Sequence, residues 1–443
     1  MFFRSGRKIY RNSFLKGFWV LLFSLTLLLA EQGSLHAQTE TTSQHESGRV
    51  DSVQILRKQY PSKTTWEHLA SLPGTIISIP FVIVFKSTEY AASYVYDSKI
   101  IPKTIDLFTS DDGSRELYPA YSNRSGFGLE YAHRRIIGPR SKLTMKISHG
   151  FVSKRQYYRF RWRRVQLTPQ SPFMFATQLS YRYLPDERFY GIGPYSKEGD
   201  KALFDRELSV VFLGAELDIA KYWEIHGMLE YNHNNTYNGE VENGSSIPHE
   251  SDINSLPGYG TRIKIARAQA GISVDSRNRL GNPTSGNQTL LYGAIFEDVG
   301  ANNYNFWKAY GDINQFIHFG HNRVLKVRLG FEITESLKNS EVPFYYLSEL
   351  GEVETIRGYT RGRFRDLNMG LGSLEYTIPF WHRIDSFLFI DAGQVGNKTE
   401  DFAVKNLNWG IGGGIKLRNT RDVVAILQLA VGREGPRVYL NIN

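Results

Sequence analysis

The sequence lacks cysteine entirely, and this absence excludes a disulfide framework and any metal site built on thiolates. Its 11 histidines are scattered, without the spacing of a pair of metal ligands. Ser148 and His149 suggest a hydrolase, but adjacent residues on a strand point to opposite faces and cannot form a nucleophile–base pair. We therefore predict no catalytic residues, no metal and no cofactor, and we do not expect an enzyme.

Long apolar runs are also scarce, and the longest indicates export. It spans residues 17–30, follows the basic residues Arg4, Arg7, Lys8, Arg11 and Lys16, and precedes Ala37, a small residue suited to cleavage. We predict a signal peptide over residues 1–37. The alternative, an uncleaved anchor helix, would need about 20 apolar residues to span a bilayer. Further on, the best candidate for a membrane helix is residues 76–85, which are too few and include Pro80.

A strong excess of one charge is missing as well. The chain has 53 basic and 44 acidic residues; without the five basic residues and Glu31 of the predicted signal, 48 face 43, a net charge of +5. Such a balance does not indicate a nucleic-acid partner. The chain is instead rich in tyrosine (26), phenylalanine (27) and glycine (40), which favours one large membrane barrel over several soluble domains.

From about residue 115 onward, apolar and polar residues alternate with a period of two. In residues 406–418, five large apolar residues fall on one face, and asparagine, glycine and basic residues fall on the other; residues 155–165, 264–275 and 323–333 repeat the pattern. This alternation indicates strands. The runs have the length of about 9–11 residues that a barrel strand needs to cross a bilayer, rather than the roughly 5–6 of a soluble sandwich.

Sixteen such runs are predicted, and their connections alternate between short and long. The strands are expected near 115–122, 125–135, 141–150, 155–166, 173–184, 206–218, 222–233, 264–275, 287–298, 304–318, 322–334, 368–379, 384–394, 406–418, 422–432 and 436–442. Short periplasmic turns and long external loops are typical of the outer membrane. The predicted fold class is all-β, a 16-stranded antiparallel transmembrane β-barrel over residues 115–443; a soluble all-β protein is the alternative.

The residues before the barrel and the basic residues of its lumen permit more than one interpretation. Residues 38–60 are predicted to be a disordered linker, and residues 61–114 a periplasmic or interfacial helical segment, or alternatively a plug in the lumen. Arg159, Arg161 and Arg163 form a basic row that faces the lumen. We expect lumen acids to neutralise it, although it could attract an anionic substrate or lipid headgroup.

The long connection 335–367 contains the motif Ile356-Arg357-Gly358-Tyr359. Two carboxylates follow it, Glu375 and Asp391, each on the polar face of one of two strands joined by a short turn. A guanidinium can meet carboxylates bidentately, so we predict that the loop folds into the lumen and that Arg357 binds both acids. The alternative places Arg357 in solvent and pairs the acids with basic residues of the lumen.

The motif, its two carboxylate strands and the terminal order of strands resemble the BamA/TamA superfamily, also called the bacterial surface antigen family. A turn with Asp275, Arg277, Asn282, Pro283 and Gly286 resembles the family's periplasmic turn after a middle strand, and residues 188–193 also recur in such barrels. The resemblance covers roughly residues 115–443. It implies that Arg357 is the tip of the sixth external loop.

The resemblance also implies a function, because family members insert proteins into the outer membrane or secrete them across it. We expect a barrel that assists insertion or translocation of polypeptides or lipids through a seam between its first and last strands. Partners would be outer-membrane lipids, client polypeptides and a periplasmic protein. Two features depart from the family: no polypeptide-transport (POTRA) domain is recognisable, and the last strand lacks a terminal aromatic residue. A passive pore or scaffold is the alternative.

Overall fold

The computed structural model describes residues 108–122, 126–151, 153–168, 170–238, 256–320, 322–381, 383–418 and 422–442. The predicted signal peptide (1–37), the linker (38–60) and most of the segment 61–114 lie outside the described residues. Of that segment, residues 108–114 are described; they include a turn in which Asp112 Oδ1 accepts a hydrogen bond from Ser114 N at 3.0 Å.

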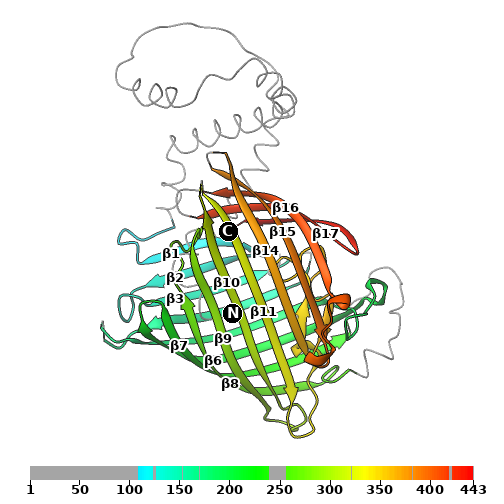
Figure 1. Ribbon diagram of the computed structural model, residues 1–443. Helices are drawn as coiled ribbons and strands as arrows, with labels where there is room; N and C mark the ends of the chain where they lie inside the picture. Colours follow the sequence, from blue (N-terminus) through cyan, green and yellow to red (C-terminus); the bar gives the residue numbers. More distant parts are fainter. Residues whose placement is uncertain are drawn as a thin grey trace, which may run out of the picture. The chain divides into compact units, whose positions relative to one another are not determined.

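Sixteen antiparallel strands form one sheet in which each strand lies beside the next in the chain (Figure 1). The strands are β1 (Arg115–Ser122), β2 (Gly126–Arg134), β3 (Lys142–His149), β4 (Gln156–Val165), β5 (Phe173–Phe189), β6 (Ala202–Ala220), β7 (Trp223–Asn238), β8 (Arg262–Asp275), β9 (Gly286–Asp298), β10 (Phe306–Phe319), β11 (Arg323–Ser336), β14 (Asn368–Trp381), β15 (Ile384–Gly396), β16 (Asn408–Arg418), β17 (Val423–Gly432) and β18 (Gly435–Ile442). Each predicted strand corresponds to one of them, and the fold class is confirmed.

The structure differs from the prediction in the lengths of β5, β6 and β7, which have 17, 19 and 16 residues. These strands continue past the point where apolar alternation ends. Polar side chains sustain the extension: the Tyr183 hydroxyl, for example, donates a hydrogen bond to Asp205 Oδ2 at 2.5 Å. Strands can continue to pair through their backbones where neither face is apolar. Hydrophobic periodicity therefore underestimates the length of such strands.

The connection between β11 and β14 contains a second, two-stranded sheet that the sequence did not indicate. It pairs β12 (Ser348–Leu350) with β13 (Phe364–Asp366). Among the described residues, the helical elements are short 3-10 turns, η2 (Glu198–Asp200), η3 (Phe344–Tyr346), η4 (Thr399–Asp401) and η5 (Val404–Asn406). Within the described ranges, no helix has the length and hydropathy needed to span a membrane.

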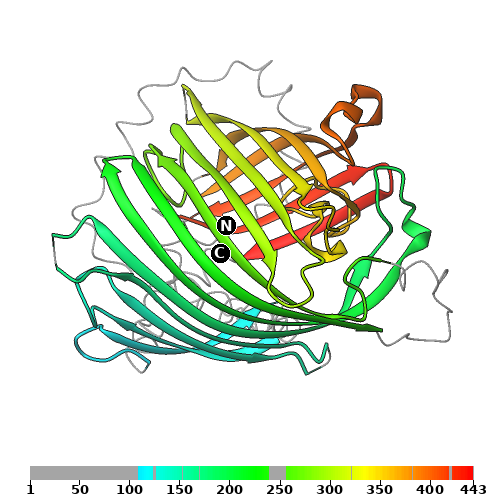
Figure 2. The same ribbon diagram turned by 90° about the horizontal axis from the view of Figure 1, so that it is seen from below.

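Side chains alternate between the two faces of the sheet as predicted. In β7, Leu229 and Tyr231 are exposed, whereas His226 and Asn232 are almost completely buried on the other face. An apolar outer face and a polar inner face suit a wall that separates lipid from a polar lumen. The sheet curls so that the connection between β11 and β14, drawn in yellow, lies on its concave side (Figure 2).

The strand order begins with β1 and ends with β18, so these two strands form the edges of the sheet. Among the described residues, β1 pairs with β2 alone and β18 with β17 alone. Each edge strand has eight residues. Side chains outside this ladder therefore matter for holding β18 in place.

Candidate functional site: an arginine loop inside the barrel

The loop between β11 and β14 owes its compact shape to glycine turns and a small apolar core. Gly351 and Gly358 have φ values of +124° and +97°, a backbone conformation that favours glycine. The Thr355 hydroxyl closes a turn by bonding both the N–H and the C=O of Gly351, each at 2.8 Å. Seven buried residues form the core beneath it: Leu350, Ile356, Tyr359, Phe364, Met369, Leu371 and Val395.

Arg357 binds Asp391 through three nitrogens. The backbone N–H and Nε donate to Asp391 Oδ2 at 3.0 and 2.7 Å, and Nη2 donates to Oδ1 at 2.7 Å. The Asp391 side chain is fully buried, and the Ser373 hydroxyl donates a further bond to it at 2.6 Å. A bidentate pair supported by additional donors is the geometry in which a buried carboxylate is stable.

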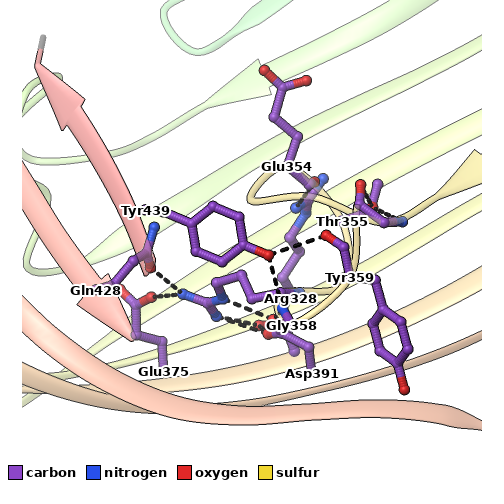
Figure 3. Close-up of polar contacts among 12 residues, drawn as sticks. Arg328, Glu354, Thr355, Gly358, Tyr359, Glu375, Asp391, Gln428 and Tyr439 are labelled. Carbon is purple, nitrogen blue, oxygen red and sulfur yellow. Dashed lines mark hydrogen bonds and ion pairs between the residues drawn. The ribbon is translucent and has the colours of Figure 1, made fainter. Parts of the chain in front are cut away.

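The same guanidinium also reaches Glu375 and the ring of Phe389. Nη1 lies 2.8 Å from Glu375 Oε2, and the Arg357 Cζ atom lies 3.4 Å from the centre of the Phe389 ring. Glu375 is shared with Lys416, whose Nζ lies 2.6 Å from Oε1. Figure 3 shows Glu375, Asp391 and Gln428 around this position. The structure therefore brings together the arginine and both acids that the sequence singled out.

Burial alone would lower the pKa of Arg357, because a dry environment disfavours the charged form. Hydrogen bonding and charge from Asp391, followed by the charge of Glu375, outweigh this effect and raise the pKa of Arg357 above its ordinary value. Arginine side chains stay protonated in proteins, so the guanidinium of Arg357 is a cation that lies between the carboxyl groups of Asp391 and Glu375.

Glycines on β16 and β17 let the loop tip, residues 356–359, approach the barrel wall. A Cβ at Gly410 would lie 1.8 Å from the backbone oxygen of Arg357, and one at Gly358 would lie 2.7 Å from the backbone nitrogen of Gly432. No side chain fits at either contact. The alternation of residues 406–418 placed Gly410 on the inner face, but nothing in the sequence indicated what would rest against it.

Tyr359 extends the contacts of the tip to the next strands. Its hydroxyl donates to the Trp409 carbonyl of β16 at 3.1 Å and accepts from the Arg433 N–H, in the β17–β18 turn, at 3.2 Å. Tyr439 of β18 also contacts the tip (Figure 3). Together, residues 357–359 contact β14, β15, β16, β17 and β18.

The other end of the loop packs against the opposite part of the wall. The Phe344 ring lies 5.4 Å from that of Phe189 and 4.9 Å from that of Phe204. The Tyr346 hydroxyl donates to Asn232 at 2.8 Å and accepts from the Asn234 side chain at 3.3 Å, both on β7. The loop is thus attached at two sites far apart along the sheet.

The segment 188–193, which the family resemblance also includes, lies against this loop. Gly193 N–H donates to the Arg365 carbonyl at 2.8 Å, and the Thr360 hydroxyl donates to that of Tyr190 at 3.0 Å. Arg363 lies 2.5 Å from Glu434 of the β17–β18 turn. The loop between β5 and β6 and the loop between β11 and β14 therefore form one packed layer.

The turn that the sequence analysis predicted to be periplasmic lies between β8 and β9, apart from the arginine loop. Arg277 Nε and Nη2 bind the two oxygens of Asp275 at 2.9 and 3.0 Å. Gly286 has a φ of +103°, and a Cβ there would lie 2.4 Å from the Ser276 carbonyl. Asn282 and Pro283 lie half-buried within the turn.

The basic row belongs to β4 and is separate from both features. Arg161 and Arg163 are buried, and an Arg159 guanidinium nitrogen lies 3.7 Å from Glu130 of β2. Over the described ranges, no group of three or more histidine, cysteine, aspartate or glutamate side chains has the geometry to hold a metal ion.

The comparisons with known proteins agree with this architecture. Residues 105–421 match the Omp85 superfamily domain. The chain is similar to the solved structure of BamA from Haemophilus ducreyi lacking POTRA domains 1–3, at 17% identity and a TM-score of 0.54, over 73% of this chain and 67% of that one.

Two other solved structures match less well. CdiB from Acinetobacter baumannii is 13% identical, with a TM-score of 0.45 over 71% of this chain and 54% of that one. A mutant of the monoaromatic hydrocarbon channel TodX is 8% identical, with a TM-score of 0.25 over 68% and 82%. No curated protein matches the sequence.

The sheet and its inward loop define a β-barrel, and the match to the Omp85 superfamily domain assigns it to the class of outer-membrane barrels. The chain belongs to the Omp85 superfamily, whose domain covers most of its length, and the predicted resemblance to BamA-type barrels is confirmed.

Replacing Arg357 with alanine should leave the buried Asp391 carboxylate without its main partner, and should leave Glu375 with Lys416 as its remaining close partner. We expect the barrel to lose about 3–5 kcal/mol of stability, the usual cost of breaking a buried ion pair from one side. The matched control is Arg361→Ala in the same loop, where the guanidinium is about half exposed and 4.0 Å from Glu352, and where the expected loss is about 0–1 kcal/mol. Urea unfolding in lipid vesicles measures both, and equal losses would contradict the assignment.

Gly410→Ala should displace the loop tip, because the added methyl group would overlap the Arg357 carbonyl. Overpacking of this kind costs about 1–3 kcal/mol. Gly372→Ala on β14 is the control, since a Cβ there has no atom within 4 Å. The protease sensitivity of the loop should rise in Gly410→Ala but not in Gly372→Ala. A rise in both variants, or in neither, would contradict the claim that the loop tip packs against Gly410.

Proposed function

We propose that this barrel assists the insertion or translocation of polypeptides, or of lipids, at the outer membrane through a lateral seam between β1 and β18. The observation that carries the proposal is the strand order, which ends at two short strands that have a partner on one side only among the described residues. Membership of the Omp85 superfamily supports it.

An open edge offers a physical means of handling a client. At the side of an edge strand where the described residues include no neighbouring strand, backbone N–H and C=O groups need other partners, because unpaired backbone groups cost several kcal/mol each in hydrocarbon. A client strand that pairs with such an edge supplies them. Outward side chains such as Leu117 and Leu440 would meet lipid during this exchange.

Arg357 has the role of a latch in this proposal. Its contacts with Asp391 and Glu375 hold the loop against the inner wall, and the loop shapes the lumen and supports the strands that lead to β18. Residues 344–346 fill the lumen on the other side with aromatic rings. Such filling disfavours a wide pore. A periplasmic partner that delivers clients is compatible with this arrangement.

Site-specific photocrosslinking tests the seam. A photoreactive residue in place of Leu440, on the outer face of β18, should trap an unfolded eight-stranded barrel protein while that client inserts into vesicles containing the protein. The control is Leu229 on β7, which has a comparable outward exposure, 64% against 58%. Equal trapping at both positions would refute a seam at β18. Large, steady conductance in planar bilayers without any trapping would instead support a passive pore.

A further inference from the structure

The last strand is connected to the loop tip by side chains on its inner face. The Tyr439 hydroxyl accepts a hydrogen bond from Gly358 N–H at 3.0 Å and donates one to the Tyr359 carbonyl at 3.1 Å. Val438 and Leu440, its neighbours on β18, point outward and are exposed. Tyr439 therefore binds the loop tip from the inner face of β18.

Arg437, two residues earlier on the same face, makes the complementary contact. Its Nε donates to the Gly358 carbonyl at 3.2 Å, and its Nη2 lies 2.9 Å from Glu198 in the loop between β5 and β6. Both backbone polar groups of Gly358 thus pair with β18 side chains. Backbone groups removed from water need such partners, so moving β18 away would leave the tip unsatisfied.

Gly358 is also adjacent to Arg357, whose own N–H binds Asp391 of β15. The backbone of the tip therefore joins two hydrogen bonds, one from Arg357 N–H to Asp391 and one from Gly358 N–H to the Tyr439 hydroxyl. On the backbone side, β18 has only the β17 ladder among the described residues. The tip is consequently a second attachment for the edge strand, independent of that ladder.

We infer that Tyr439 and Arg437 are positioning residues that couple the edge strand β18 to the loop tip, so that the state of the loop sets how readily β18 separates. The inference rests on the proposed function for its biological meaning, but the coupling itself is a property of the fold. Coupling between two elements is reciprocal: releasing the tip loosens β18, and withdrawing β18 loosens the tip.

Hydrogen exchange of the full chain in lipid nanodiscs tests the coupling. Tyr439→Phe keeps the ring and removes the hydroxyl that makes both bonds. We expect exchange of the β18 amides to accelerate by about ten-fold, as two lost hydrogen bonds would allow. Amides of β14 and β15 should be unchanged, because the Arg357 contacts with Glu375 and Asp391 remain.

Tyr346→Phe is the matched control. Its hydroxyl belongs to the same loop and also accepts one hydrogen bond and donates one, but to β7. This variant should leave β18 exchange at the wild-type rate. Arg437→Gln provides a second, independent variant, which should accelerate β18 exchange in the same direction as Tyr439→Phe.

The inference is overturned if neither Tyr439→Phe nor Arg437→Gln accelerates β18 exchange, or if exchange rises uniformly from β14 to β18, as general destabilisation would produce. Because this measurement contains no client, it separates the two proposals. Accelerated β18 exchange without client trapping at position 440 would support the coupling and refute the seam function.

Discussion

The structure depends on the need to neutralise one buried cation, the guanidinium of Arg357. Its counter-ions come from two adjacent strands, Asp391 and Glu375, and removing charge from water is expensive unless such partners are close and correctly oriented. Because Asp391 and Glu375 belong to the barrel wall and Arg357 to the loop, satisfying this charge requires the loop to enter the lumen. The approach of the loop in turn requires glycine at positions 358 and 410.

From that contact, the loop organises the lumen. Its tip touches the last five strands of the sheet, and its aromatic residues 344–346 pack against β5 to β10. Among the described residues, β1 and β18 each pair with a strand on one side only, and a ladder stabilises a strand only where a neighbour exists. The loop thus acts as an internal support, and this explains why a region that alternation leaves featureless contains its own small core.

The sequence was sufficient to predict all sixteen wall strands, because residues facing lipid must be apolar and residues facing the lumen need not be. It also indicated Glu375 and Asp391 as partners of Arg357, since both fall on inner faces of adjacent strands. It could not reveal that Tyr439, Phe389 and Gly410 contact the loop tip, because these contacts join segments that are distant in the sequence. The short strands β12 and β13 were missed because three residues are too few to show a period, and β5 to β7 were underestimated because their ends are polar.

The central claim is that Arg357 and Asp391 act as one unit. A double-mutant cycle of Arg357→Ala and Asp391→Ala, measured by urea unfolding in vesicles, tests it most directly. Removing both charges leaves no uncompensated ion of this pair, so the double variant should lose less stability than the sum of the single variants, by about 1–3 kcal/mol. Strictly additive losses would show that the two residues do not act together and would contradict the account.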